Sequence, residues 1–265
     1  MKKLLAGLAA AALAVIPMTA ASADEHENTD VYVVHAFPGA DVDVYVYGDG
    51  DDRPDEATLA NFSPEDVAGP VSLPAGSYAV DITLPGEDDA LLSEVLDVPA
   101  SANVTVVAHP TGDGELAVTP FVNDMSAVEC GEARIEVRHT AQAPEVFLST
   151  GDTELGSISL GETFAADVAA GDLPVTVALE DGTELIDTTL ELGDSSYTIL
   201  HAFFEDGELS VIPIGLELDC TEAPDEEHSP GEAGLASTAL PVWVIALMAI
   251  GALSLAAPAV ARKRN

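Results

Sequence analysis

The chain has 265 residues, of which 47 are Asp or Glu and 8 are Lys or Arg, so its formal net charge is −39. Hydrophobic residues nevertheless make up 48% of it, and the mean hydropathy is +0.25. All acidic residues lie between Asp24 and Glu232, a span whose only basic residues are Arg53, Arg134 and Arg138. This span lacks the basic surface that nucleic-acid binding needs, which excludes that class of partner, and it argues against docking on anionic lipid. Because it contains no lysine, Schiff-base chemistry is excluded there as well.

The N-terminal residues 1–23 are typical of a secretory signal peptide. Lys2 and Lys3 form a positively charged start, and residues 4–16 form a short apolar run. Residues 21–23, Ala-Ser-Ala, have the small-x-small pattern of a cleavage site. We therefore expect an exported chain that is cleaved after residue 23, and the alternative is an uncleaved N-terminal anchor.

The middle of the chain contains an internal repeat, which indicates a tandem duplication. Several segments of the first half recur in the second at an offset that falls from 104 to 93, which places longer early loops in the first copy. The matched pairs are residues 34–36 with 138–140, 43–46 with 145–148, 74–80 with 169–175, and 113–116 with 206–209.

Within each copy the hydrophobic period is two, which is typical of half-buried antiparallel strands. Tyr78, Val80 and Ile82 alternate with Ala79 and Asp81, and Ile135 and Val137 alternate with charged residues. Each copy offers six or seven such strands in about 95 residues, the size of a small sandwich. We therefore predict an all-β fold with two tandem small antiparallel β-sandwich domains, immunoglobulin-like or transthyretin-like, at residues 24–126 and 127–220.

Three segments of the first copy carry a family resemblance, namely residues 31–38, 42–45 and 74–78. They resemble the bacterial family called domain of unknown function 4397 (DUF4397), in tandem cell-surface proteins of the actinobacterial type. The second copy opens similarly at residues 134–144, although Leu173 stands where the first copy has Tyr78. The resemblance implies exported or surface β-sandwich domains without assigned catalytic residues.

The two cysteines, Cys130 and Cys220, bracket the second copy. In an exported chain this arrangement predicts a disulfide that joins the two ends of one domain. The alternative is a pair of free thiols.

Four histidines raise the question of a zinc or copper site, because His35 and His139 occupy matched positions and His109 and His201 both end the same late strand of their copies. No His-x-His or His-Glu-x-x-His spacing occurs. Duplicated positions favour a structural role, so we expect His35 and His139 to close their strands and to bond the turns that follow.

An acidic loop supplies Asp49, Asp51, Asp52 and Asp55, whose oxygens would suit Ca²⁺. The spacing does not fit an EF-hand, because Arg53 and Pro54 take the fifth and sixth positions and the sixth requires glycine. We interpret this segment as a solvated loop and expect no cofactor, with Ca²⁺ as the alternative.

No signature of an enzyme is present. The chain contains no Gly-x-Ser-x-Gly nucleophile motif, and its single tryptophan, Trp243, lies in the C-terminal apolar segment rather than in a sugar-stacking surface. Pairs of carboxylates are unavoidable among 47 acids and identify no glycosidase site by themselves. We expect no enzymatic activity.

The C-terminal region is typical of a surface anchor. Residues 221–240 form an acidic stalk that contains proline and glycine, residues 241–261 form an uncharged span long enough for a transmembrane helix, and residues 262–265 form a basic cytoplasmic tail. The segment before the span resembles the Leu-Ala-x-Thr-Gly signal of class E sortases of actinobacteria, with alanine replacing the final glycine. Its residues are Leu235, Ala236, Ser237, Thr238 and Ala239.

These features predict a single-pass protein on the outer face of the cell membrane, with its C-terminus inside. Two modes of attachment remain open, simple membrane anchoring through the helix and transfer to the cell wall after Thr238. The predicted function is that of a non-enzymatic surface protein with a structural or adhesive role toward the cell wall or another surface component. The alternative is an extracellular binding module for a divalent cation or a small ligand.

Overall fold

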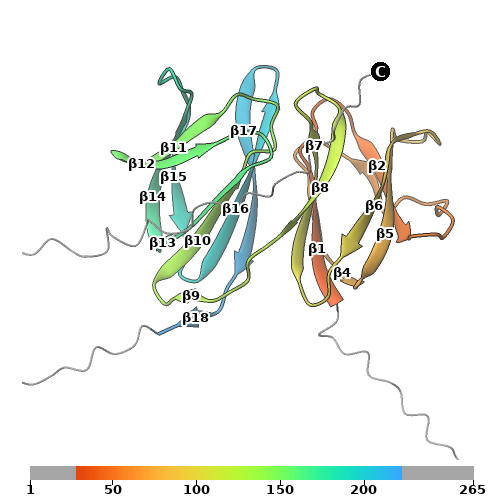
Figure 1. Ribbon diagram of the computed structural model, residues 1–265, viewed down its shortest axis with the longest axis horizontal. Coiled ribbons are helices and arrows are strands. Elements are labelled where there is room, and N and C mark those ends of the chain that lie inside the picture. Colours follow the sequence, from red (N-terminus) through yellow and green to blue (C-terminus); the bar gives the residue numbers. More distant parts are fainter. Residues whose placement is uncertain (1–27, 223–265) are drawn as a thin grey trace, which may run out of the picture. The chain divides into compact units, whose positions relative to one another are not determined.

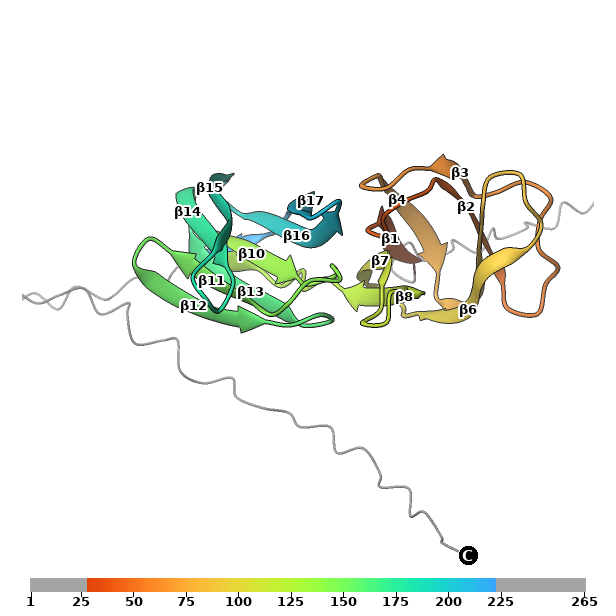
Figure 2. The ribbon, with the colours of Figure 1, turned by 90° about the horizontal axis from the view of Figure 1, so that it is seen from above.

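The structure of the protein is a computed structural model, which describes residues 28–222. The regular elements of this part are all β-strands, which confirms the prediction of an all-β fold (Figures 1 and 2). No helix capable of crossing a membrane occurs within these residues. The predicted signal peptide, the transmembrane segment, the basic tail and the sorting motif at residues 235–239 lie outside the described residues.

Strands β1–β8 form two four-stranded sheets, which we call the N-terminal sandwich (Figure 1). The strand orders are β4-β1-β7-β8 and β3-β2-β5-β6, and only the β1–β7 pair is parallel. The strands are β1 Asn28–His35, β2 Val42–Gly48, β3 Leu59–Phe62, β4 Val67–Pro74, β5 Gly76–Thr83, β6 Ala90–Val98, β7 Asn103–Pro110 and β8 Leu116–Val122.

Strands β10–β17 repeat this arrangement as the C-terminal sandwich, with orders β13-β10-β16-β17 and β12-β11-β14-β15. Within these two sheets, only the β10–β16 pair is parallel. The strands are β10 Glu132–Arg138, β11 Val146–Thr150, β12 Thr153–Ile158, β13 Thr163–Ala169, β14 Gly171–Ala178, β15 Glu184–Leu192, β16 Ser196–Glu205 and β17 Glu208–Glu217. Each sandwich therefore has eight strands rather than the six or seven expected.

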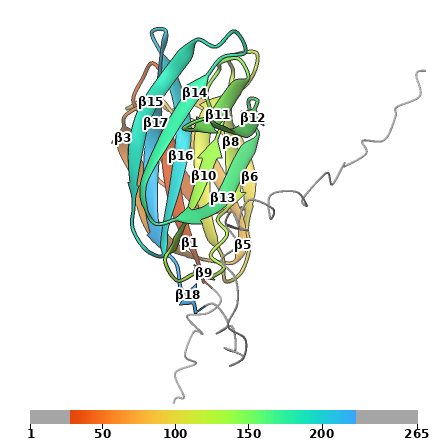
Figure 3. The ribbon, with the colours of Figure 1, turned by 90° about the vertical axis from the view of Figure 1, so that its left-hand side faces the viewer.

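A separate two-stranded sheet lies at one end of the C-terminal sandwich (Figure 3). It pairs β9 Val128–Glu129 with β18 Cys220–Thr221 in parallel. This sheet therefore brings together the segments that lead into and out of the C-terminal sandwich.

The strand order corrects one part of the predicted fold class. In an immunoglobulin constant domain the first strand lies beside the second, in the order ABED on one sheet and CFG on the other. Here β1 lies between β4 and β7, and β2 belongs to the opposite sheet. The immunoglobulin-like alternative is therefore wrong, and the transthyretin-like alternative stays a prediction.

A hydrophobic cluster fills part of the space between the two sheets of the N-terminal sandwich. Val44 and Ile82 reach it from one sheet, and Ala108 and Val118 reach it from the other. Both sets come from β-branched or small residues that suit a half-buried strand. The cluster is thus the core expected from the period-two pattern.

A second cluster joins the outer faces of the two sheets that contain β1 and β10. Val34 and Val107 contribute from the N-terminal sandwich, and Ile199, Ile212 and Tyr197 contribute from the C-terminal sandwich. The central strands of these sheets are consequently buried on both faces, and β7 shows almost no polar alternation. Residues 28–222 also belong to one compact unit.

The pairing of the strands corrects two details of the sequence repeat. Val33 pairs with Val106, and the matching Val137 pairs with Leu200, so His201 corresponds to Val107 rather than to His109. In the same way, residues 42–46 correspond to residues 146–150, two positions further along than the sequence match suggests. Hydrophobic residues in a short alternating strand recur at every second position. An alignment of the two copies that is shifted by two residues therefore matches the sequence equally well.

Candidate functional site

An apolar cavity of about 160 Å³ lies between the two sheets of the N-terminal sandwich. All eight strands of that sandwich contribute to its lining. The side chains that matter most for its shape are aliphatic and point inward, because they occupy alternate positions on their strands. They include Val33, Val44, Val46, Ala68, Val80 and Val106.

The cavity reaches the molecular surface. Val71, on the edge strand β4, lines the cavity and is nevertheless 41% exposed. Asp97, on β6, also lines it and is exposed. Several inward-pointing side chains, such as Val33 and Val106, are only partly buried for the same reason.

Three of the polar side chains that line the cavity bond protein groups. The Nδ1 of His35 donates to the carbonyl of Phe62 at 2.9 Å, and the Tyr78 hydroxyl donates to the carbonyl of Pro74 at 3.0 Å. Asp97 accepts a hydrogen bond from the hydroxyl of Ser77 at 2.6 Å. The surface that the lining presents to a bound molecule is therefore mainly hydrocarbon.

The corresponding space in the C-terminal sandwich is much smaller, about 40 Å³. The strand pairing explains the difference, because Val33 pairs with Ala68 while the matching Val137 pairs with Phe164. Phe164 fills the position that Ala68 leaves open. The two sandwiches thus share one strand order, but only the N-terminal sandwich has the larger cavity.

A buried polar cluster lies on β10 at the face shared by the two sandwiches. Arg134, Glu136 and Arg138 alternate along this strand and are only 7%, 8% and 0% exposed. The alternation of charged and apolar residues predicted a half-buried strand, but the structure buries the charged face of β10 as well. The face is covered because it packs against the shared core described above.

Arg138 has partners for each part of its guanidinium group. Its Nε donates to Glu136 Oε1 at 2.7 Å, its Nη2 donates to Asn123 Oδ1 at 2.7 Å, and its plane lies 4.6 Å from the centre of the Phe121 ring. Asn123 is itself tied to β7, since its backbone N–H donates to Asn103 at 2.8 Å. Arg138 therefore connects β10 to the end of the N-terminal sandwich.

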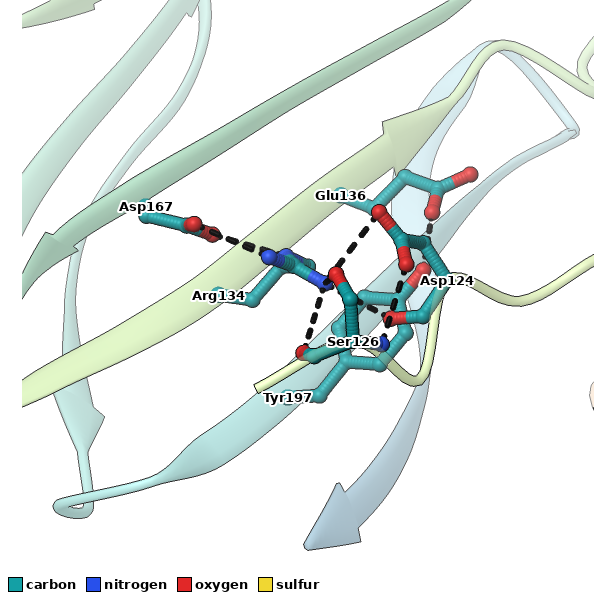
Figure 4. Close-up of polar contacts among 6 residues, drawn as sticks. All are labelled: Asp124, Ser126, Arg134, Glu136, Asp167 and Tyr197. Atoms are coloured by element: carbon teal, nitrogen blue, oxygen red, sulfur yellow. Dashed lines mark hydrogen bonds and ion pairs between the residues drawn. The ribbon is translucent and has the colours of Figure 1, made fainter. Parts of the chain in front are cut away.

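Arg134 forms a second set of contacts (Figure 4). Its Nε and Nη2 donate to the two carboxylate oxygens of Asp167 at 2.7 and 2.9 Å. Its Nη1 donates to the carbonyl of Asp124 at 2.7 Å and to the Ser126 hydroxyl at 3.0 Å. Hydrogen bonding to Asp167 raises the pKa of Arg134, so the cation is firmly fixed between β13 and the segment that links the sandwiches.

Tyr197 completes this cluster by donating its hydroxyl proton to Glu136. Burial, followed by this hydrogen bond, raises the pKa of Tyr197. Hydrogen bonds from Ser126 lower the pKa of Asp124. The cluster therefore joins carboxyl groups, two arginines and a phenol through hydrogen bonds.

The four histidines have structural contacts and do not converge. His201 donates from Nδ1 to the carbonyl of Ile212 at 3.3 Å, and burial followed by repulsion from Arg138 lowers its pKa to about 3. Burial also lowers the pKa of His109 and of His35. His139 bonds the carbonyl of Pro144 in the following turn, as predicted, whereas His35 bonds Phe62 on β3 instead of its own turn.

The proposed calcium ligands are not brought together. Among residues 28–222, no three His, Cys, Asp or Glu side chains gather as metal ligands, and Asp49, Asp51, Asp52 and Asp55 follow one another in an exposed loop. Arg53 folds back from this loop, with its Nη2 at 3.6 Å from Asp88 and its plane at 4.8 Å from the Tyr45 ring centre. The acidic loop thus contains one cationic side chain, that of Arg53.

Cys130 and Cys220 form a disulfide, with a Cα–Cα distance of 4.9 Å. The bond lies beside the β9–β18 pair, where the chain enters and leaves the C-terminal sandwich.

Sequence reasoning missed both the cavity and the buried cluster. The cluster had a signal, because Arg134, Glu136 and Arg138 lie on one face of a strand in a span with only three basic residues. The sequence signal for the cavity was weaker. It is the contrast between Ala68 and Phe164, which can be recognised only with the correct strand register.

Residues 29–149 match the model of a family described as domain of unknown function (DUF4397). The matched part runs from the second residue of β1 to β11, so it includes nearly all of the N-terminal sandwich and its cavity. The finding confirms the resemblance seen in residues 31–38, 42–45 and 74–78. No curated protein matches the chain.

Several solved structures are distantly similar to the chain. A family CBM26 module, CBMbc, from Eubacterium rectale Amy13K, solved with maltoheptaose, is 13% identical, with a TM-score of 0.27, and the match covers 69% of this chain and 95% of that one. A putative cell adhesion protein from Bacteroides uniformis is 9% identical, with a TM-score of 0.22 and coverages of 74% and 98%. The fimbrial anchor protein Mfa2 from Porphyromonas gingivalis is 11% identical, with a TM-score of 0.19 and coverages of 73% and 100%. Likenesses this distant do not bear on function.

Proposed function

We propose that this is an exported, non-enzymatic surface protein that presents two acidic sandwiches as one unit in a structural or adhesive role. The observation that carries the proposal is the hydrophobic cluster shared by the two sandwiches. A cluster of this kind stiffens the pair, because bending would expose Val34, Val107 and Ile199 to water. Such a unit suits a protein that projects from a surface.

The identical strand order of the two sandwiches supports a second part of the proposal, that they are tandem copies of a DUF4397 domain. The domain boundaries at residues 24–126 and 127–220 belong to this part. The signal peptide, the anchor at residues 241–261 and the actinobacterial type rest on the sequence patterns alone. The mature C-terminus decides between membrane anchoring and sorting after Thr238.

Two epitope tags test the location. One tag is inserted in the exposed loop between Asp51 and Asp55, and the other follows Asn265. We expect antibody to reach the loop tag on intact cells and the C-terminal tag only after permeabilisation. A loop tag that requires permeabilisation would refute the surface location, whereas a C-terminal tag missing from the mature protein would favour transfer to the cell wall.

A further inference from the structure

We propose that the cavity of the N-terminal sandwich binds a small uncharged apolar molecule, of the size of one aromatic ring or a short alkyl chain. This goes beyond the surface role proposed above, which requires no ligand. Three features of the molecule support a ligand here: the lining of the cavity, the irregular strand beside its mouth, and the difference between the two sandwiches.

The lining selects the class of ligand. Of the side chains that line the cavity, all but His35, Thr58, Tyr78 and Asp97 are apolar. An ammonium or carboxylate group placed among the valines would lose its hydration and find no compensating partner. An engineered apolar cavity of roughly 150 Å³ binds benzene, and this cavity has a similar volume of about 160 Å³.

The edge strand beside the mouth is irregular only in the N-terminal sandwich. Pairing between β1 and β4 is interrupted between Val31 and Val33, whereas β10 and β13 pair without interruption. Gly69 adopts a positive φ of 119° here, and a Cβ at this position would lie 2.6 Å from the carbonyl oxygen of Val31. Bulges of this kind are frequent beside binding sites, because they redirect an edge strand.

The comparison between the sandwiches shows that the cavity is not a necessity of the fold. Both sandwiches have the same strand order, yet Phe164 closes the interior of one while Ala68 leaves the other open. Because one larger side chain fills the interior in a sandwich of the same strand order, the open cavity results from the residues of the N-terminal sandwich and not from its topology. The pair also supplies matched variants, Ala68→Phe to close the first interior and Phe164→Ala to open the second.

Isoleucine methyl groups give each interior its own reporter. Ile82 is the only isoleucine between residues 28 and 127, is buried, and lines the larger cavity. Ile135 is buried and lines the smaller one. Ile199 and Ile214 lie in the shared core and report whether a variant is folded.

The experiment titrates toluene into the intact chain, held in lipid nanodiscs and labelled with ¹³C at the isoleucine δ1 methyl groups. We expect a saturable shift of the Ile82 signal and none at Ile135. In Ala68→Phe the Ile82 response should weaken at least tenfold, and in Phe164→Ala a saturable response should appear at Ile135. Benzoate, which has a similar ring and a charge, should shift neither signal.

Several outcomes would overturn the proposal. They are an Ile82 signal that does not respond saturably to toluene, an equal response to benzoate, and a response retained in a folded Ala68→Phe chain. If Ala68→Phe loses the Ile199 and Ile214 signals and is therefore unfolded, Phe164→Ala decides the question. A folded Phe164→Ala chain without an Ile135 response would contradict the comparison on which the proposal rests.

Discussion

At the scale of single residues, the three arginines of the acidic span have different surroundings. Arg138 and Arg134 are buried at the face shared by the sandwiches, while the side chain of Arg53 is 26% exposed beside a loop. A buried charge is tolerated only when its partners remain, because removing one partner leaves the other desolvated and unpaired. Burial therefore determines how much stability is lost when each arginine is replaced.

The first prediction concerns Arg138. Replacing Arg138 by Met leaves the Glu136 carboxylate buried without its cation, and we expect a loss of about 3 to 5 kcal/mol in the free energy of unfolding. Urea denaturation of the full chain measures it. Arg53→Met is the matched control and should cost about 1 kcal/mol or less, because Arg53 is partly exposed. Equal losses in the two variants would contradict this account of the cluster.

The second prediction concerns His201, whose pKa falls to about 3 in the folded state because it is buried beside Arg138. The unfolded chain binds a proton near the ordinary value of 6.5, so the stability from keeping His201 neutral is complete above that pH. It is lost between pH 6.5 and 3, by up to about 1.4 kcal/mol for each pH unit.

Replacing His201 by Gln removes this titration. The variant should therefore show a shallower fall in stability with acid than the parent chain, measured by urea denaturation from pH 7 to pH 4. Parallel pH profiles for the two chains would show that His201 does not titrate as described.

At the scale of elements, β9 and β18 and their disulfide hold the ends of the C-terminal sandwich together. Cys130 and Cys220 are 90 positions apart, so the cross-link closes a long loop in the unfolded chain. In the chain-entropy view, closing a loop of this length stabilises the folded state by about 4 to 5 kcal/mol, as an upper figure.

The third prediction follows from this position. In the double variant Cys130→Ala and Cys220→Ala, amide exchange should accelerate most in β10–β17 and least in the outer sheet of the N-terminal sandwich, β3-β2-β5-β6. That sheet has a core of its own around Val44 and Ile82. Native-state hydrogen exchange measures the difference, and uniform acceleration across both sandwiches would contradict it.

Elements also show where the sequence repeat was informative and where it failed. The repeat predicted strands and their alternation because side chains on opposite faces of a strand meet different environments. It misplaced β11 relative to β2, and it matched His109 with His201, because a shift of two residues preserves the alternation. Hydrogen-bonded pairing between distant strands removes that ambiguity.

At the scale of the whole molecule, the dominant feature is charge. Between residues 24 and 232 there are 47 acidic residues and three arginines, all three of which are occupied by acidic neighbours. The acids that remain repel one another across the folded surface, which destabilises the compact state until salt screens them.

The fourth prediction is that the melting temperature rises with NaCl. A gain of about 2 kcal/mol between 10 mM and 500 mM salt would raise it by roughly 4 to 8 °C. Choline chloride at the same ionic strength is the control and should act equally, since screening depends on charge rather than on the identity of the cation. A melting temperature independent of salt would contradict the effect, and an effect of Ca²⁺ alone would indicate a specific site.

The sequence by itself determined the all-β class, the DUF4397 resemblance and the segregation of charge, because these depend on local alternation and composition. The hollow interior of the N-terminal sandwich was decided only by the tertiary structure. Ala68 and Phe164 become counterparts once β4 pairs with β1 and β13 pairs with β10. The burial of Arg134, Glu136 and Arg138 was likewise decided there, because a strand that alternates charged and apolar residues does not reveal what covers its charged face.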